Sequence, residues 1–220
     1  MADGMARARP AELLVLLAVV LADLAYTGIA PYDRLTWSME VAPVVIALPL
    51  AIATWRRFPL TPLLYRLIFI HALILILGGY YTYVRVPLGL WFAELFGLAR
   101  NHYDRLGHLA QGFVPAILAR EILIRRSPLS GTRWLPFLVV CVCLAFSAFF
   151  ELIEWTSALI LGQDADAYLA TQGDPWDTQW DMFLALVGAV VALVTLSRIH
   201  DRQLGKPPGE RQRWENRTTA

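Results

Sequence analysis

Three short clusters of acidic and histidine side chains stand at the ends of long apolar segments in this sequence. The first spans residues 101–108, the second contains Glu151 and Glu154, and the third spans residues 174–181. Ionisable groups at membrane depth are costly unless they meet a partner, water or an ion. These clusters are therefore the first place to look for chemistry, provided that folding brings them together.

The spacing inside each cluster puts its polar side chains on one face of a helix. Asp104 and His108 are four residues apart, and Glu151 and Glu154 are three apart. Asp177 and Asp181 in the third cluster are again four apart. Carboxylates and imidazoles together suit a divalent cation, and a nearby carboxylate can act as a base toward metal-bound water. The predicted metal ligands are His102, Asp104, His108, Asp177 and Asp181. The predicted catalytic acids are Glu151 and Glu154. Further polar candidates are His71, Gln111 and Asp174.

Other arrangements of these residues are also open. Carboxylates crowded in a poorly solvated place repel one another, and the ion that offsets this repulsion could be a metal, a shared proton or the guanidinium groups of Arg100 and Arg105. Asp104 and the aspartates of the third cluster could instead cap helix N-termini. The glutamate pair and His71 could be core residues that are satisfied by hydrogen bonds.

Composition places the chain in a membrane. It has 220 residues, of which 57% are hydrophobic and 17% charged, and its mean hydropathy is +0.51. Repeated long apolar runs at this level are typical of an integral membrane protein. The net charge of +1 leaves no basic surface for nucleic acid. Cys141 and Cys143 are two residues apart on an expected helix and point to different faces, so they predict no disulfide framework.

The apolar runs predict an all-α, polytopic membrane helix bundle of about six transmembrane helices. The predicted spans are 11–30, 38–54, 63–81, 106–124, 135–161 and 180–197. Residues 1–200 form a single transmembrane domain, and 201–220 a polar, disordered cytoplasmic tail. The segment from Val86 to Leu98 is too short to cross and predicts an interfacial or re-entrant helix. Arg120 and Glu121, at the end of the fourth span, are expected to be interfacial charges that snorkel to water.

The basic residues predict which ends of the spans lie inside the cell. With both termini in the cytoplasm, most of the arginines fall in cytoplasmic segments, as the positive-inside rule requires, and an even number of spans fits. These residues are Arg7, Arg9, Arg56, Arg57, Arg120, Arg125, Arg126, Arg133 and the basic residues from Arg198 onward. In this topology all three polar clusters lie near the outer face of the membrane.

Three stretches of the chain resemble the YjdF-like family of bacterial inner-membrane proteins, which is built around a domain of unknown function. They are 100–113, with the run Arg-Asn-His-Tyr-Asp-Arg-Leu-Gly-His; 145–155, which carries the two glutamates; and 171–182, with the run Gln-Gly-Asp-Pro-Trp-Asp. The resemblance covers nearly the whole chain except its tail. It implies a multi-pass inner-membrane protein of this size and supplies no activity, substrate or ligand.

Three functions fit the sequence. The first is a cation-dependent membrane enzyme that acts on a lipid or another amphiphile at an outward-facing His/carboxylate cluster. The second is a transport or binding protein in which the same acids carry a cation or protons. The third is a structural membrane scaffold that holds a polar cluster. The lipid bilayer is the expected partner in each case, nucleic acid in none.

Overall fold

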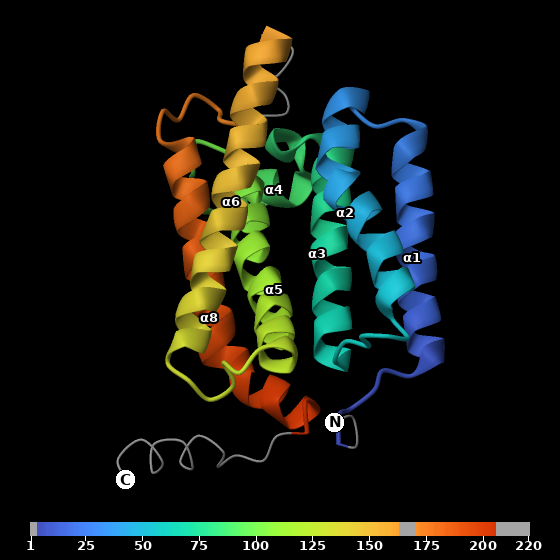
Figure 1. The fold of residues 1–220 in the computed structure, drawn as a ribbon. Helices are drawn as coiled ribbons and strands as arrows, with labels where there is room; N and C mark the ends of the chain where they lie inside the picture. The colour runs from blue at the N-terminus through green and yellow to red at the C-terminus, as the bar shows by residue number, and fades with distance from the viewer. Residues whose placement is uncertain (1–3, 163–169, 206–220) are drawn as a thin grey trace.

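A computed structural model describes residues 4–162 and 170–205 of the chain. Within these ranges it contains seven α-helices, one short 3-10 helix and no strand (Figure 1). The elements are α1 (Pro10–Ile29), α2 (Arg34–Thr54), α3 (Pro62–Tyr81), η1 (Tyr83–Arg85), α4 (Pro87–Phe96), α5 (Tyr103–Arg126), α6 (Trp134–Leu161) and α8 (Asp177–Gln203). The predicted all-α class is confirmed, and the long helices follow the predicted spans closely. Of the predicted tail, residues 206–220 lie outside the described part of the chain.

Local sequence signals explain where several helices begin and end. Pro10, Pro62 and Pro87 each occupy the first turn of their helix, where a missing N–H costs nothing. The Asp33 carboxylate caps α2 by accepting the Thr36 N–H at 2.6 Å. The short α4, predicted as a non-crossing helix over Val86 to Leu98, ends at a glycine in the left-handed conformation.

In the described part of the chain, five helices are long and apolar enough to cross a membrane: α1, α2, α3, α6 and α8. The sixth long helix, α5, lies alongside them and packs against α3, α6 and α8 (Figure 1). It carries buried polar residues along much of its length, which makes it less apolar than the other five. A helix of 20 residues is about 30 Å long, so each of these elements matches the thickness of a bilayer core.

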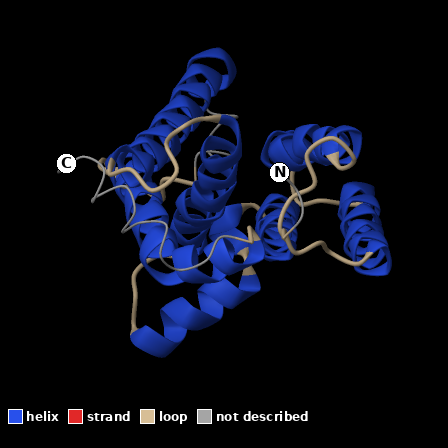
Figure 2. Ribbon diagram, turned by 60° about the horizontal axis from the view of Figure 1, so that its bottom comes forward, coloured by secondary structure: helices blue, strands red, loops and turns tan. Residues whose placement is uncertain are grey.

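The helices form two groups that meet where α3 packs against α5. One group contains α1, α2 and α3, with Val20, Val41 and Ile76 in its core. The other contains α5, α6 and α8, and its core includes Ile117 and Val139. Figure 2 turns the end with the chain termini toward the viewer and shows the two groups side by side.

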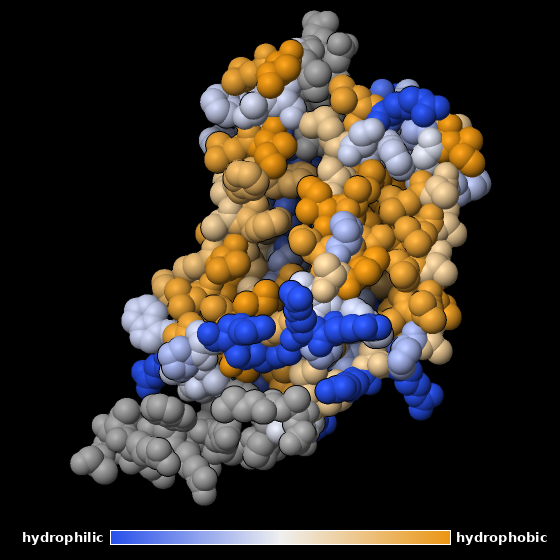
Figure 3. Space-filling model, turned by 45° about the vertical axis from the view of Figure 1, so that its right-hand side comes forward, coloured by the Kyte–Doolittle hydropathy of each residue, from blue (hydrophilic) through white to orange (hydrophobic). Residues whose placement is uncertain are grey.

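Both described chain ends lie at the same end of the bundle, which we call the terminal end (Figure 1). The Ala6 N–H donates to the Gln203 carbonyl oxygen at 2.7 Å. The outer surface of the long helices is apolar, and hydrophilic side chains gather toward the terminal end of the face shown in Figure 3. The polar residues discussed next lie toward the opposite end, where α5 and α8 begin.

Candidate metal centre

His108 is the middle of the candidate centre. Its Nδ1 lies 2.9 Å from the Gln111 Oε1, and with that oxygen as acceptor the Nδ1 carries the proton. The other ring nitrogen, Nε2, then presents its lone pair. This nitrogen lies 3.6 Å from the Asp104 Oδ1 and 3.8 Å from the Asp181 Oδ2. Gln111 is therefore placed to orient the histidine, as hydrogen-bond partners commonly do for metal-binding imidazoles.

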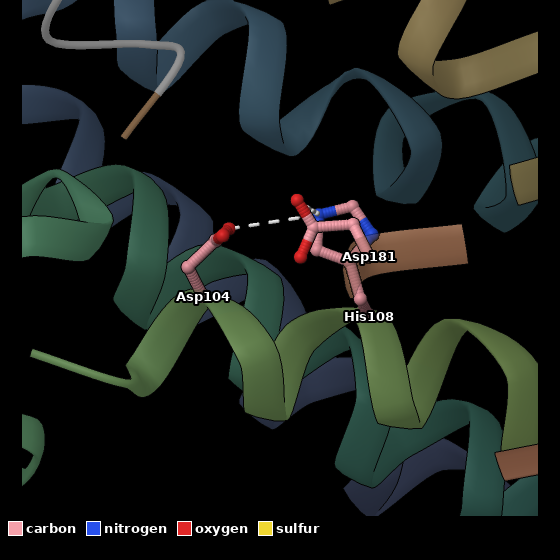
Figure 4. A group of neighbouring side chains, drawn as sticks. All are labelled: Asp104, His108 and Asp181. Carbon is pink, nitrogen blue, oxygen red and sulfur yellow. Dashed lines mark ion pairs between the residues drawn. The ribbon is translucent and has the colours of Figure 1, made fainter. Parts of the chain in front are cut away.

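Two helices bring these ligand atoms together. Asp104 and His108 sit one turn apart at the start of α5, and Asp181 comes from the first turns of α8. Figure 4 shows the Asp104 carboxylate facing the His108 imidazole, with the Asp181 side chain beside the ring. One ligand atom from each of the three residues lies within 4.8 Å of the other two. The structure thus places these three side chains, which come from two separate segments of the chain, next to one another.

The carboxylates of this centre are buried and incompletely satisfied. Asp104 is 7% exposed, Asp181 2% and Glu151 6%. One oxygen of each has no hydrogen-bond partner among the described residues: Oδ2 of Asp104, Oδ1 of Asp181 and Oε1 of Glu151. A buried carboxylate oxygen without a partner is costly, so such atoms normally have a ligand, a proton or water beside them. A cation with oxygen and nitrogen ligands fits this donor set.

The glutamates of α6 form the third side of the centre. The Glu151 Oε1 lies 3.8 Å from the His108 Nδ1. His108, Glu151 and Glu154 make up a second group of potential ligands within 4.8 Å of one another. Both glutamates are thus within the distance at which groups share an ion or a proton. Ser147, one turn before Glu151, is also fully buried, and its hydroxyl has no hydrogen-bond partner in residues 4–162 and 170–205.

Two arginines hold the aspartates at the rim of the centre. Arg100 donates to Asp174 at 3.1 Å and to Asp177 at 2.9 Å, and Arg105 donates to Asp174 at 2.9 Å. The ion pairs expected as an alternative to a metal therefore exist at Asp174 and Asp177. Among the described residues, Asp177 is in neither group of potential metal ligands.

His102 precedes α5 and stands apart from the ligand groups identified in the described part of the chain. Burial, with the positive charges of Arg105 and Arg100 as smaller causes, lowers the pKa of His102 below its ordinary value. The ring is therefore neutral at pH 7. The neighbouring Asn101 anchors this segment by donating to the Val84 and Val86 carbonyl oxygens, both at 3.1 Å.

A cavity adjoins the centre and extends toward α2 and α3. Its volume is about 60 Å³, enough for a few water molecules. His71 and Gln111 line it together with Asp104, His108 and Glu154. Two further polar residues line it that the sequence did not single out as site candidates, Glu40 of α2 and Tyr83 of η1. Glu40 lies three residues after Trp37, within an apolar span. An isolated acid in such a span is the sequence feature that could have identified it. Tyr83 carries no comparable signal.

A second polar network lies at the terminal end, and it corrects the expectation for Arg120 and Glu121. These residues do not snorkel: Glu121 is fully buried and Arg120 is 7% exposed. The Glu121 Oε2 lies 3.0 Å from the Nε2 of His200 and accepts from the Thr61 hydroxyl at 2.8 Å. The Arg120 guanidinium lies 2.9 Å from the His200 Nδ1. His200 comes from the far end of α8, so no local spacing could reveal this network.

Comparison with known proteins agrees with the resemblance seen in the three polar stretches. Residues 12–202 match a family described as "Predicted membrane protein (DUF2238)". The chain belongs to this family. It is also 59% identical over 181 residues to the inner membrane protein YjdF of Escherichia coli (strain K12), an alignment that covers 82% of this chain and 87% of that protein. No solved structure matches the chain. The protein is thus an inner-membrane protein with several spans, in a family whose description names no activity.

Proposed function

We propose that this protein is a cation-dependent membrane enzyme that acts on a lipid or another amphiphile. The observation that carries the proposal is the set of buried ligand atoms around His108: the Nε2 with oxygens of Asp104 and Asp181 at 3.6 and 3.8 Å. Ligand atoms that share a metal through bonds of about 2 Å lie about 3 to 3.5 Å apart. The observed separations are close to that range and need only a small contraction around an ion.

The number of ligands favours catalysis over a purely structural ion. Structural sites are usually closed by four protein ligands, whereas catalytic sites have three and keep an open position for water or substrate. Asp104, His108 and Asp181 supply three, and Glu151 lies on the other side of the imidazole. A bound divalent ion would lower the pKa of its water. Glu151 or Glu154 would then accept the proton from that water.

The position of the centre indicates the class of substrate. It lies inside a bundle whose outer surface is apolar, next to a cavity lined by both carboxylates and phenylalanines. Such a place is reached most readily by a molecule that is itself partly dissolved in the bilayer. An amphiphile can place its polar group at the centre while its chain stays among apolar side chains.

Transport of a cation or protons is the alternative function. An apolar layer in the middle of the bundle argues against it. Gln111 and Arg120 mark the facing ends of the two polar networks on α5, about 13 Å apart along the helix at 1.5 Å per residue. The intervening Ala116 and Ile117 are fully buried in an apolar core that includes Val139 of α6. A path for ions needs polar groups or water throughout. This apolar layer favours chemistry near one face of the membrane.

We also propose that α5 crosses as the sixth span, that both termini are cytoplasmic and that the centre faces outward. The supporting observations are the length of α5, its place among the apolar helices, the shared terminal end and the distribution of arginines. Reporter fusions at residue 205 and in the loop between α4 and α5 test this topology. Activity of a cytoplasmic reporter at 205 and of a periplasmic reporter in the loop is expected. The reverse pattern would place the centre on the cytoplasmic side.

Elemental analysis of detergent-purified protein tests the function. About one divalent metal ion per chain is expected in the wild type, and most of it should be lost in His108→Ala and Asp181→Asn. His102→Ala is the matched control and should keep the metal, because His102 is outside both ligand groups. Metal-free wild type that also fails to bind Zn²⁺ or Mn²⁺ on titration would overturn the proposal.

The enzymatic part needs a separate measurement. Purified protein is incubated with vesicles of bacterial lipid extract, and lipid products are followed by mass spectrometry with and without a chelator. A metal-dependent product is expected from the wild type and none from Glu151→Gln with its metal and thermal stability intact. Ion or proton flux into vesicles without any lipid product would instead favour the transport alternative. Lower stability of Glu151→Gln and His108→Ala, in a protein that binds no metal and yields no product, would favour a scaffold.

A further inference from the structure

The cavity beside the metal ligands has several acidic groups, and its described lining holds no lysine or arginine to balance them. Three carboxylates line it, those of Glu40, Asp104 and Glu154. Among the described residues that form the lining, none is a lysine or an arginine. Glu40 is 3% exposed and Asp104 is 7% exposed. The Oδ2 of Asp104 has no hydrogen-bond partner among the residues that the structure describes. Carboxyl groups this deeply buried need an opposite charge or a proton close by.

The metal ligands do not account for all of these acids. The group with Asp104 and Asp181 can hold an ion without using Glu40 or Glu154. Glu40 belongs to α2, on the far side of the cavity from α8, and takes part in neither ligand group of the described residues. A second positive charge beside the metal therefore fits the remaining carboxylates.

Aromatic side chains complete the lining in a way that suits an organic cation. Tyr83, Phe146 and Phe150 line the same cavity. The faces of aromatic rings attract ammonium groups, most strongly where water is excluded, and recognition of quaternary ammonium groups commonly uses such rings. Carboxylates and rings around one small space thus favour an alkylammonium group over a hydrated metal ion.

The cavity also reaches the apolar surface of the bundle. Phe146 lines it and is 58% exposed on the outside of α6. On the other side of the cavity Pro43 belongs to α2, whose next outward residues, Val45 and Ile46, are 53% and 62% exposed. Figure 3 shows apolar side chains flanking a hollow with hydrophilic atoms at its bottom. A ligand with an alkyl chain can lie in such a hollow with its head inside.

We propose that the cavity binds the ammonium headgroup of an amphiphile, which reaches it sideways from the bilayer between α2 and α6. Glu40 and Glu154 bind the positive head, the rings of Phe146 and Phe150 pack against it, and the alkyl chain lies along the outer apolar surface. The inference rests on the proposed function, since it assigns the substrate class of the same centre. In this position the part of the amphiphile that joins the head to the chain would lie next to His108, which also lines the cavity.

Three amphiphiles that share one dansyl-labelled undecyl chain and end in trimethylammonium, hydroxyl or carboxylate test this directly. Binding to the protein in detergent is followed by energy transfer from tryptophan, at pH 7 with chelator and again with Zn²⁺. We expect the trimethylammonium probe to bind at least tenfold more tightly than the other two in both conditions. Equal binding, or preference for the carboxylate, would overturn the inference. A preference that disappears with Zn²⁺ would also overturn it, because the head would then occupy the metal ligands.

Variants and a soluble competitor sharpen the test. Glu40→Gln and Glu154→Gln should each reduce the preference for trimethylammonium at least fivefold, whereas Glu94→Gln, the same change at an exposed position of α4, should leave it unchanged. Choline, which has the head and no chain, should compete at least a hundredfold more weakly than the amphiphile. Competition at similar concentrations would assign the cavity to a soluble amine instead.

The metal content of the same samples separates this inference from the proposed function. If the protein binds metal but shows no preference for the ammonium probe, the proposed function is supported and the ammonium substrate class is contradicted. If the protein prefers the ammonium probe but binds no metal, the ammonium site is supported and the metal-dependent function is contradicted. If a variant fails to fold, the comparison of the three probes on the wild type decides the matter alone.

Discussion

Gly112 of α5 lies directly against the backbone of Ala185 on α8, so close that a Cβ atom at position 112 would overlap the Ala185 carbonyl oxygen. The relationship is reciprocal, because a Cβ atom at Gly188 of α8 would overlap the Leu109 carbonyl oxygen of α5. Gly112 follows His108 by one turn and Ala185 follows Asp181 by one turn. The close approach of the two backbones therefore sets the 3.8 Å distance between the His108 Nε2 and the Asp181 Oδ2.

Gly112→Ala should separate the two helices and weaken the centre. Inserting a methyl group into a filled contact costs about 1–3 kcal/mol, and here the neighbour is backbone, which cannot rotate away. We expect a lower unfolding temperature in detergent and reduced metal content. Val194→Ala, at a position of α8 that is 77% exposed, is the control and should change neither. Unchanged stability and metal content in Gly112→Ala would contradict the packing described here.

His200→Ala should destabilise the protein without removing its metal. The change leaves Glu121 and Arg120 buried without their shared partner, and breaking a buried network of this kind costs about 3 kcal/mol. Chemical or thermal unfolding in detergent measures the loss, with His102→Ala as the control for removing an imidazole. Loss of metal from a folded His200→Ala protein would show that the terminal-end network belongs to the metal centre.

Arg100→Gln should destabilise the protein more than Arg105→Gln. Arg100 bridges Asp174 and Asp177 through two charged hydrogen bonds, whereas Arg105 makes one to Asp174 and a contact with the Trp180 ring at 5.2 Å. Charge-assisted hydrogen bonds are each worth about 1.5–3 kcal/mol, so the difference should be about 1–3 kcal/mol. Unfolding temperatures of the two variants measure it. If the two variants unfold at the same temperature, or if Arg105→Gln unfolds at the lower temperature, then Arg100 does not hold the start of α8 against α5.

His102→Gln should make the protein less sensitive to mild acid. The pKa of His102 lies below its ordinary value of 6.5 in the folded chain because of burial and the nearby arginines. The unfolded chain then binds the proton more readily, so stability falls as pH drops through about 6.5. The fall in unfolding temperature between pH 7.5 and 5.5 should be smaller in His102→Gln than in the wild type. A fall of equal size in both would mean that His102 carries no such linkage.

Sequence reasoning identified much of the centre because its signals are local. Asp104, His108 and Gln111 share a helix face by spacing alone, and Glu151 and Glu154 are visible as acids within an apolar run. The same reasoning also grouped His102 and Asp177 with the ligands. In the structure His102 precedes the helix, and Asp177 pairs with Arg100 at 2.9 Å. Spacing along the chain shows which side chains share a helix face. It does not show which carboxylate will form an ion pair with an arginine from another segment.

Composition and the lengths of the apolar runs by themselves predicted the class of fold, the approximate ranges of the long helices and the short α4. A bilayer requires long apolar helices that satisfy their own backbone hydrogen bonds. Such a helix is formed by consecutive apolar residues, so it can be recognised in the sequence. The tertiary structure alone decided that Asp181 meets His108, that Glu40 and Tyr83 share their cavity, and that His200 lies between Arg120 and Glu121. These contacts join residues tens of positions apart, and they depend on helix packing at particular glycines, a geometry to which distant parts of the sequence contribute together.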